Sequence, residues 1–171
     1  DLFLYVIINP ARLQHVQIRM ETRMKIQFTG DKELAYLVEE LKEQTGVTAD
    51  GTLPVRAEKT DKGLRLAREG AGVKIEYGRL ADFNRALGAL PAFYASGQKE
   101  LYQEASFETL GYMPDCSRNA VLNVEGAKLL IRHLAVMGFN ALMLYTEDTY
   151  EIEGYPYFGY MRGRFTKAEL K

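Results

Sequence analysis

The chain has 171 residues, of which 47% are hydrophobic and 26% are charged, and its formal net charge is −1. This composition is typical of a globular protein that can bury a core, and the length fits one domain or a domain with a piece of another. Acidic and basic residues are interspersed along the chain. The absence of a basic stripe excludes a typical nucleic-acid-binding protein.

Other residue counts exclude further classes. The single cysteine, Cys116, cannot form an intramolecular disulfide, and with only two histidines in the chain we expect no structural zinc site and no cofactor. No run approaches the roughly 18 apolar residues that cross a bilayer. Residues 2–8 are apolar, but Asp1 stands where a signal peptide carries positive charge, so we predict a cytoplasmic location.

The first half of the chain predicts a small domain at residues 24–110. Residues 24–28 alternate as a strand, and residues 31–46 carry the apolar stripe of a helix that ends at Gly46. Residues 51–54 indicate a loop. Residues 2–8 and 13–20 are strand-like, and for residues 1–23 both a native hairpin extension and a foreign tag stay open.

A hairpin and a second helix follow. Residues 64–66 and 73–77 alternate around Glu69-Gly-Ala-Gly72, which predicts a hairpin turn, because a dinucleotide site needs a third glycine and a following helix. Residues 79–96 predict a helix that Pro91 should kink or split. The order β, α, ββ, α predicts a small α+β sandwich, an antiparallel or mixed sheet covered by two helices on one face. Residues 98–109 are expected to be a connection.

The second half predicts a β-α-β unit. Residues 111–116 and 141–145 are strand-like, and residues 124–137 have helical spacing that ends at Gly138. Ligands of parallel α/β folds bind outside the carboxyl ends of the strands. We therefore expect one face to collect polar side chains that follow the two strands, namely Asp115, Ser117, Arg118, Glu147 and Asp148. Pro114 cannot donate to a ladder and suggests a bulge.

Three motifs of this half closely resemble the start of the catalytic barrel of family 20 glycoside hydrolases. They are Asp115-Cys-Ser-Arg-Asn, the helix end Met137-Gly-Phe-Asn140, and Leu144-Tyr-Thr-Glu-Asp-Thr-Tyr-Glu151 with the tyrosine-rich segment up to Arg164. The branch is that of β-N-acetylhexosaminidases whose second barrel strand ends in Thr-Glu-Asp. Leu110 departs from the many members that carry arginine directly before the glycine of the first strand.

The resemblance implies an α/β fold in which the domain at 24–110 precedes the first β-α-β portion of a TIM barrel at 111–171. Such enzymes remove terminal β-linked N-acetylhexosamine with retention, through attack by the substrate's own acetamido oxygen. Their catalytic Asp-Glu pair follows the fourth barrel strand. A complete barrel takes about 250 residues. We therefore interpret the chain as an N-terminal fragment that lacks the catalytic residues and is inactive alone. Residues 166–171 are expected to begin another helix.

The resemblance also implies substrate-binding roles for Asp115, Arg118, Glu147, Asp148 and Tyr150, toward glycans that contain N-acetylhexosamine. Ion pairing is the alternative for the charged residues, between Asp115 and Arg118 and from Glu147 or Asp148 to nearby arginines. A catalytic dyad is disfavoured because adjacent strand residues point to opposite faces.

Four further expectations concern the tyrosine-rich segment, self-association, Cys116 and the alternative function. The tyrosine-rich segment at 150–160 is either a sugar-pocket wall or a loop packed by its own aromatic side chains. The incomplete barrel predicts self-association, and Cys116 is interpreted as an inert packed thiol. A non-catalytic carbohydrate-binding or protein-interaction domain is the alternative function.

Overall fold

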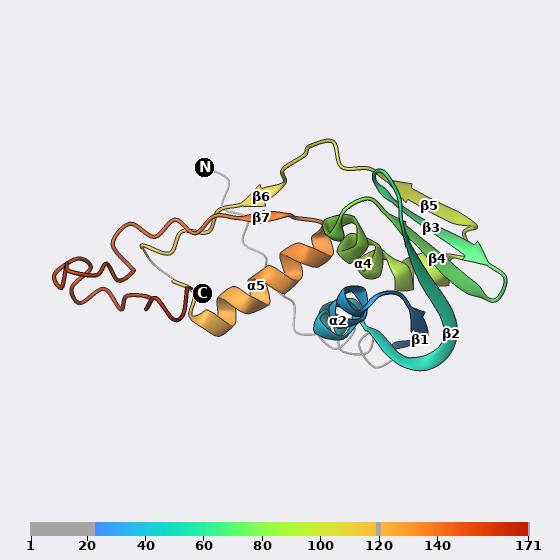
Figure 1. The fold of residues 1–171 in the computed structure, drawn as a ribbon, viewed down its shortest axis with the longest axis horizontal. Coiled ribbons are helices and arrows are strands. Elements are labelled where there is room, and N and C mark those ends of the chain that lie inside the picture. Colours follow the sequence, from blue (N-terminus) through green and yellow to red (C-terminus); the bar gives the residue numbers. More distant parts are fainter. Residues whose placement is uncertain (1–22, 119–120, 171) are drawn as a thin grey trace, which may run out of the picture.

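The computed structural model describes residues 23–118 and 121–170. A five-stranded mixed sheet of order β1-β2-β4-β3-β5 forms its larger part (Figure 1). β1 pairs with β2 and β2 with β4 in parallel, while β3 is antiparallel to both β4 and β5. The strands are β1 (Met24–Thr29), β2 (Val47–Lys59), β3 (Leu64–Glu69), β4 (Gly72–Tyr77) and β5 (Glu100–Gln103).

The helices of this layer begin and end near the predicted positions. They are α2 (Lys32–Glu40), α3 (Lys42–Thr45) and α4 (Leu80–Ser96). Asp31 caps α2 by accepting a hydrogen bond from the backbone N–H of Leu34 at 2.9 Å. The predicted helix over 31–46 is interrupted at Leu41, where φ is −99° and ψ is 7°, and it ends at Gly46 as expected.

Two strands of the sheet were not predicted. The expected loop at 51–54 is wrong, because these residues lie within β2. The β1–β2 register shifts between Lys25, which pairs with Thr48, and Ile26, which pairs with Leu53. The residues of β2 between these two pairs are irregular, although the strand continues on both sides of them. Gly51 permits this path, since a Cβ there would lie 2.2 Å from the Lys25 carbonyl carbon. β5 lies in the expected connection at 98–109.

Pro91 was expected to kink or split the second helix, and it does not split it. α4 runs continuously through it. A proline inside a helix removes one hydrogen bond and costs about 3 kcal/mol. Leu87, Leu90 and Phe93 are buried on either side of the proline, and this packing offsets the loss.

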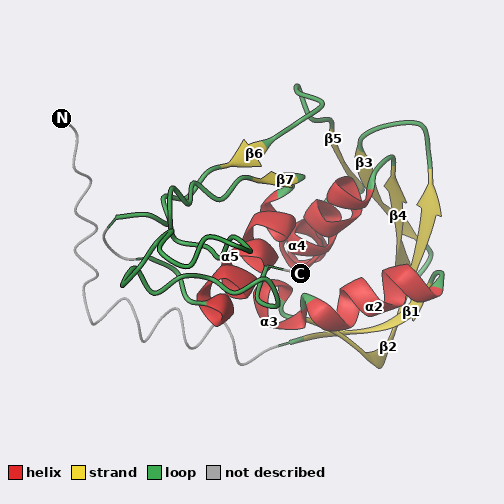
Figure 2. Ribbon diagram, turned by 60° about the vertical axis from the view of Figure 1, so that its left-hand side comes forward, coloured by secondary structure: helices red, strands yellow, loops and turns green. Residues whose placement is uncertain are grey.

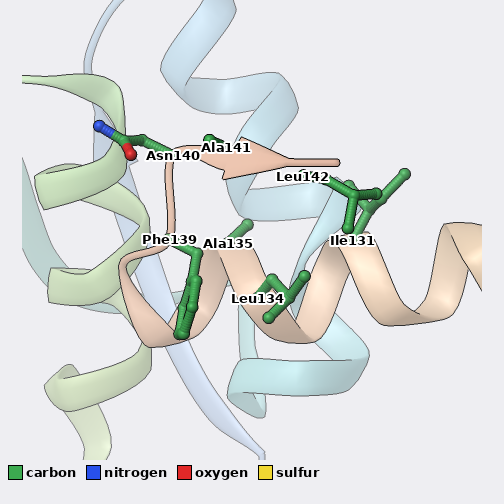
Figure 3. A pocket seen from close by; sticks show the side chains of 7 residues that line it. All are labelled: Ile131, Leu134, Ala135, Phe139, Asn140, Ala141 and Leu142. Atoms are coloured by element: carbon green, nitrogen blue, oxygen red, sulfur yellow. The ribbon is translucent and has the colours of Figure 1, made fainter. Parts of the chain in front are cut away.

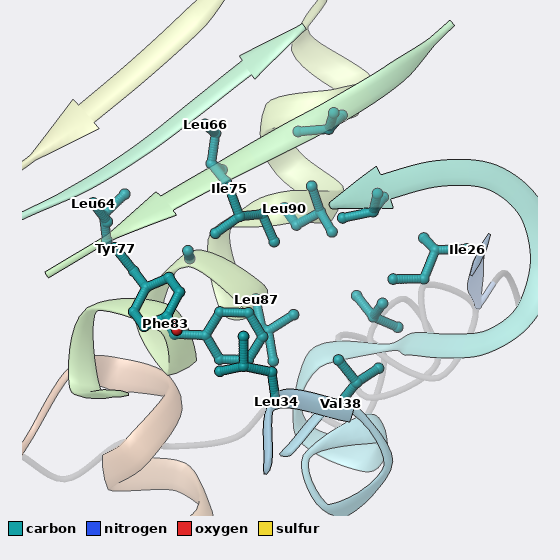
Figure 4. Packing of buried hydrophobic residues seen from close by; sticks show 14 of the residues in the cluster. Ile26, Leu34, Val38, Leu64, Leu66, Ile75, Tyr77, Phe83, Leu87 and Leu90 are labelled. Atoms are coloured by element: carbon teal, nitrogen blue, oxygen red, sulfur yellow. The ribbon is translucent and has the colours of Figure 1, made fainter. Parts of the chain in front are cut away.

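The core lies between one face of the sheet and the helices (Figure 4). Alternate residues of β3 and β4 are buried there, and Phe83 of α4 packs edge-on against Tyr77 at a centroid distance of 5.5 Å. The intervening residues carry charges that pair with one another on the other face, such as Arg65 with Glu76 at 3.0 Å. The predicted sheet with helices on one face is therefore confirmed, with a short third helix added.

The second half forms the predicted β-α-β unit. It comprises β6 (Gly111–Tyr112), α5 (Val124–Met137) and β7 (Ala141–Leu142), with β6 and β7 parallel. Asn123 caps α5, and Gly138 ends it with a φ of 90°. Within the described residues this sheet has two strands, so the barrel itself remains a prediction.

The suggested bulge at Pro114 is wrong. Gly111 pairs with Ala141 and Asp115 with Tyr145, so the register is the same before and after the proline. Pro114 instead removes one backbone donor from the ladder. The regular strands are consequently shorter than the predicted ones.

Helix α5 joins the two halves and lies beside α4 (Figure 2). A Cβ on Gly88 of α4 would lie 2.4 Å from Cγ1 of Val136, which shows how closely the helices approach. Arg132 of α5 pairs with Glu40 of α2 at 2.6 Å. The side chain of Asn140 accepts from the N–H of Leu110 and donates to the carbonyl of Glu108, which fixes the entry into β6.

Candidate functional site

Five side chains meet where β6 and β7 lead into their loops. Arg118 connects them, because its Nη1 donates to Oδ2 of Asp115 at 2.6 Å and its Nη2 donates to Oε1 of Glu147 at 3.0 Å. The Tyr145 hydroxyl donates to the same Glu147 oxygen at 3.0 Å, and its ring centroid lies 5.4 Å from the guanidinium carbon. Ser117 donates to Oδ1 of Asp115 through its N–H and its hydroxyl. We call these residues the carboxyl-edge cluster.

Hydrogen bonds and charge keep Asp115 and Arg118 ionised. The Ser117 hydroxyl, followed by Arg118, lowers the pKa of Asp115 from 3.8 to about 2. The bond to Asp115 in turn raises the pKa of Arg118. At neutral pH Asp115 is therefore a carboxylate that accepts hydrogen bonds and Arg118 a cation that donates them.

The backbone at Glu147 is strained. Its φ of 47° lies in the left-handed region, which costs a residue other than glycine about 1–3 kcal/mol. Arg118 and Tyr145 both bind the carboxylate that this conformation turns toward them. Strain that is held by specific contacts is typical of functional sites.

Asp148 has a different partner from its neighbour. Its Oδ1 lies 3.3 Å from Nε of Arg162, whereas Glu147 binds Arg118. The two carboxylates are thus engaged separately, but the premise of strand alternation is wrong, because both residues lie in a turn after β7 and Glu147 has a φ of 47°. Ion pairing is confirmed for Asp115, Glu147 and Asp148, and a direct role in substrate binding remains a prediction for each.

The loop after β7 is fastened to the end of β6 by residues that sequence reasoning did not single out as functional. Thr149 is buried and donates to the carbonyl of Cys116 at 2.8 Å, and Arg162 donates to the carbonyl of Ser117. Gly159 lies against the carbonyl of Asp148, where a Cβ would approach to 1.9 Å. These contacts position Glu147 opposite Asp115 and Arg118.

The tyrosine-rich segment divides into two groups. Tyr150 packs edge-on against Phe158 with a centroid distance of 5.3 Å, so this pair confirms the interpretation of a self-packed loop. Tyr155, Tyr157 and Tyr160 are exposed instead. Within the described residues no hydrogen bond joins Tyr150 to the carboxyl-edge cluster, and its substrate contact stays a prediction.

Other features of the described ranges do not resemble sites. Cys116 is buried, and burial raises the pKa of its thiol, in keeping with an inert packed residue. Residues 23–118 and 121–170 contain no group of three or more acidic, histidine or cysteine side chains that could hold a metal ion. Among the helices of the same ranges, none is long and apolar enough to span a membrane.

An apolar hollow of about 220 Å³ lies between α5 and the start of β7 (Figure 3). Ile131, Leu134 and Phe139 line it together with Leu142. It lies toward the amino end of β7, away from the carboxyl edge where α/β folds bind ligands. We therefore place the candidate site at the carboxyl-edge cluster.

Solved structures share the fold of this chain. The β-hexosaminidase of Streptomyces plicatus, crystallised with its product GlcNAc, superimposes with a TM-score of 0.62 at 23% identity, over 86% of this chain and 38% of that chain. The chain has the fold of part of a GH20 β-hexosaminidase. The GH20 β-N-acetylhexosaminidase of Streptomyces coelicolor gives a TM-score of 0.58 at 20% identity, over 88% of this chain and 38% of that one.

The GH20 exo-β-N-acetylglucosaminidase of Vibrio harveyi is also similar, with a TM-score of 0.57 at 21% identity over 81% of this chain and 25% of that chain. No protein-family profile and no curated protein sequence matches the chain. The chain thus spans between 25% and 38% of the length of these three GH20 enzymes. Their likeness establishes the fold.

Proposed function

We propose that the chain is the N-terminal part of a retaining glycoside hydrolase that removes terminal β-linked N-acetylhexosamine, and that the acetamido oxygen of the substrate is its nucleophile. In this proposal β6, α5 and β7 begin a TIM barrel, and the five-stranded domain precedes it. The fold shared with GH20 enzymes supports this assignment. The resemblance of the motifs around Asp115 and Glu147 supports it independently.

The carboxyl-edge cluster would bind the sugar and leave the proton transfer to other residues. A general acid needs a proton near neutral pH, and the pKa of Asp115 is lowered to about 2. The observation that carries the assignment is the geometry of the cluster, in which Arg118 donates to Asp115 at 2.6 Å and to Glu147 at 3.0 Å at the ends of the two parallel strands. Arg118 would donate to a sugar hydroxyl, while Asp115, Glu147 and Asp148 would accept from hydroxyls and Tyr150 would line the pocket.

The catalytic Asp-Glu pair would come from a part of the barrel outside this chain. We therefore expect the 171-residue chain to have no hydrolytic activity of its own. General acid catalysis alone contributes about 10²- to 10⁴-fold. Most of the pocket would be missing as well.

Hydrolysis of a chromogenic N-acetylglucosaminide tests the proposal, with the 171-residue chain and a longer form that includes the rest of the barrel assayed side by side. We expect turnover only by the longer form. Turnover by the 171-residue chain that Glu147→Gln abolishes would show that the cluster itself is catalytic. An inactive, folded longer form would contradict the hydrolase assignment.

A non-catalytic carbohydrate-binding domain is the second candidate, and the exposed tyrosines after β7 favour it. It predicts that the longer form binds N-acetylglucosamine oligomers without cleaving them. The same side-by-side assay, combined with a binding measurement, separates the two functions.

A further inference from the structure

A second hollow lies on the loop that follows the carboxyl-edge cluster. It has a volume of about 340 Å³, at the lower end of the roughly 300–1,000 Å³ of small-molecule sites. Backbone bonds close the loop around it, because Glu151 N–H donates to the carbonyl of Phe165 at 3.0 Å and Phe165 N–H to that of Thr149 at 2.8 Å. The hollow is therefore part of a hydrogen-bonded loop.

One wall of this hollow is aromatic and apolar. Tyr155 and Pro156 form it, and the Tyr155 side chain is exposed, with 66% of its surface accessible. A tyrosine left this exposed presents a flat apolar ring beside a hydroxyl, and such rings are typical of recognition surfaces.

The rest of the lining carries balanced charges. It contains two acidic residues, Glu151 and Glu153, and two basic residues, Arg164 and Lys167, besides Ile152 and Gly154, and Lys167 pairs with Glu153 at 2.6 Å. Arg164 donates to the carbonyl of Phe158 at 2.7 Å. The carboxylate of Glu151 has no hydrogen-bond partner among residues 23–118 and 121–170, which leaves it free to accept from a ligand.

The aromatic and charged residues of the lining indicate which class of ligand the hollow can bind. Two acidic and two basic groups cancel, so the lining favours neither an anion nor a cation. A pyranose ring has hydroxyl groups for Glu151 and an apolar C–H face for Tyr155. We propose that the hollow lined by Tyr155 and Glu151 is a second sugar-binding site, separate from the carboxyl-edge cluster. Only the choice of N-acetylhexosamine as the sugar rests on the proposed function.

Titration of the ¹⁵N-labelled chain with N-acetylglucosamine trimer, followed by amide chemical shifts, tests this site. We expect shifts at residues 151–156 and 164–167. Tyr155→Ala should weaken binding about tenfold, while Tyr155→Phe should keep it because the ring remains. Tyr36→Ala is the matched control, since Tyr36 is also exposed, with 62% of its surface accessible, and lies on α2 in the other half.

Three results would overturn the inference: no shifts in the loop, shifts confined to the carboxyl-edge cluster, or equal weakening by Tyr155→Ala and Tyr36→Ala. Hydrolysis by the longer form is an independent readout of the proposed function. If hydrolysis occurs and the loop does not bind, only the second site is wrong. If the loop binds and the longer form does not hydrolyse, only the hydrolase assignment is wrong.

Discussion

The two halves of the molecule bury their side chains to very different degrees. The main core consists of buried residues between Ile26 and Phe93, all from the five-stranded domain. Among the described residues of the β-α-β unit, Cys116 and Leu134 are the only buried hydrophobic ones, whereas Met113, Met137 and Met143 are exposed. The first half is organised around its own core, and the second is organised around ion pairs and hydrogen bonds at one sheet edge.

Helices cover the sheets of the two halves to different extents. The five-stranded domain encloses its apolar face with α2, α3 and α4. The β-α-β unit has α5 on one side only, and its two short strands make a sheet that is marginally stable by itself. Its contacts with α4 and Glu40 therefore contribute to holding it in place.

The largest expected effect is on the free energy of unfolding, which should depend on the core of the first half far more than on exposed side chains of the second. Phe83 is fully buried in the core, and Phe83→Ala should lower the free energy of unfolding by about 3–5 kcal/mol. Met143→Ala, at a side chain with 65% of its surface accessible, should change it by less than about 0.5 kcal/mol. Urea denaturation measures both, and equal losses would show that the halves share one core.

The exposed apolar side chains of the second half predict self-association. Met113 and Met143 lie on the same face of the paired strands, and no further strand within the described ranges pairs with β6 or β7. We expect light scattering at tens of micromolar to show a mass above that of the monomer, with Met143→Lys reducing it.

Tyr36→Lys is the control for self-association, because it adds the same charge at an exposed residue of the first half. A monodisperse monomer with protected amides in both strands would contradict the expectation. The five-stranded domain would then stabilise the unit without a second copy.

A smaller effect concerns the pH dependence of the second half. The folded pKa of Asp115, about 2, is below its ordinary value of 3.8. Its contribution to stability is therefore complete above about pH 4 and is lost as the pH falls toward 2. Titration of the carboxyl carbons by NMR should give Asp115 a midpoint near 2.

Ser117→Ala should raise this midpoint toward 3.8, because the Ser117 hydroxyl is the largest cause of the shift. A wild-type midpoint at the ordinary value would mean that Ser117 and Arg118 do not hold the carboxylate in solution.

Sequence patterns predicted the elements that have clear periodicity and end signals. Helix α5 occupies Val124–Met137 as expected because its apolar stripe is bounded by Asn123 and Gly138. β2 was missed because Asp50, Gly51 and Pro54 have turn chemistry. Asp50 and Gly51 lie where the β1–β2 register shifts, and the strand is held by the pairing of the residues around them with β1 and, from Val55 on, with β4.

The candidate site was predictable in its residues and only partly in its contacts. Parallel strand ends predicted that Asp115, Arg118 and Glu147 would meet. The partner of Asp148 could not be chosen among Arg118, Arg162 and Arg164, because that choice depends on how the loop folds around Gly159. The buried role of Thr149 also has no local sequence signal, since its acceptor is the carbonyl of Cys116.

The central claim is that the carboxyl-edge cluster binds the sugar, and kinetics of the longer form test it most directly. Arg118→Met and Glu147→Gln should each lower kcat/KM for an N-acetylglucosaminide roughly 10- to 150-fold, the effect of losing a hydrogen bond to a charged group. The matched pair Arg65→Met and Glu76→Gln, from the ion pair on the outer face of the five-stranded sheet, should leave kcat/KM unchanged. Equal effects of the two pairs, or no effect of Arg118→Met and Glu147→Gln, would contradict the claim.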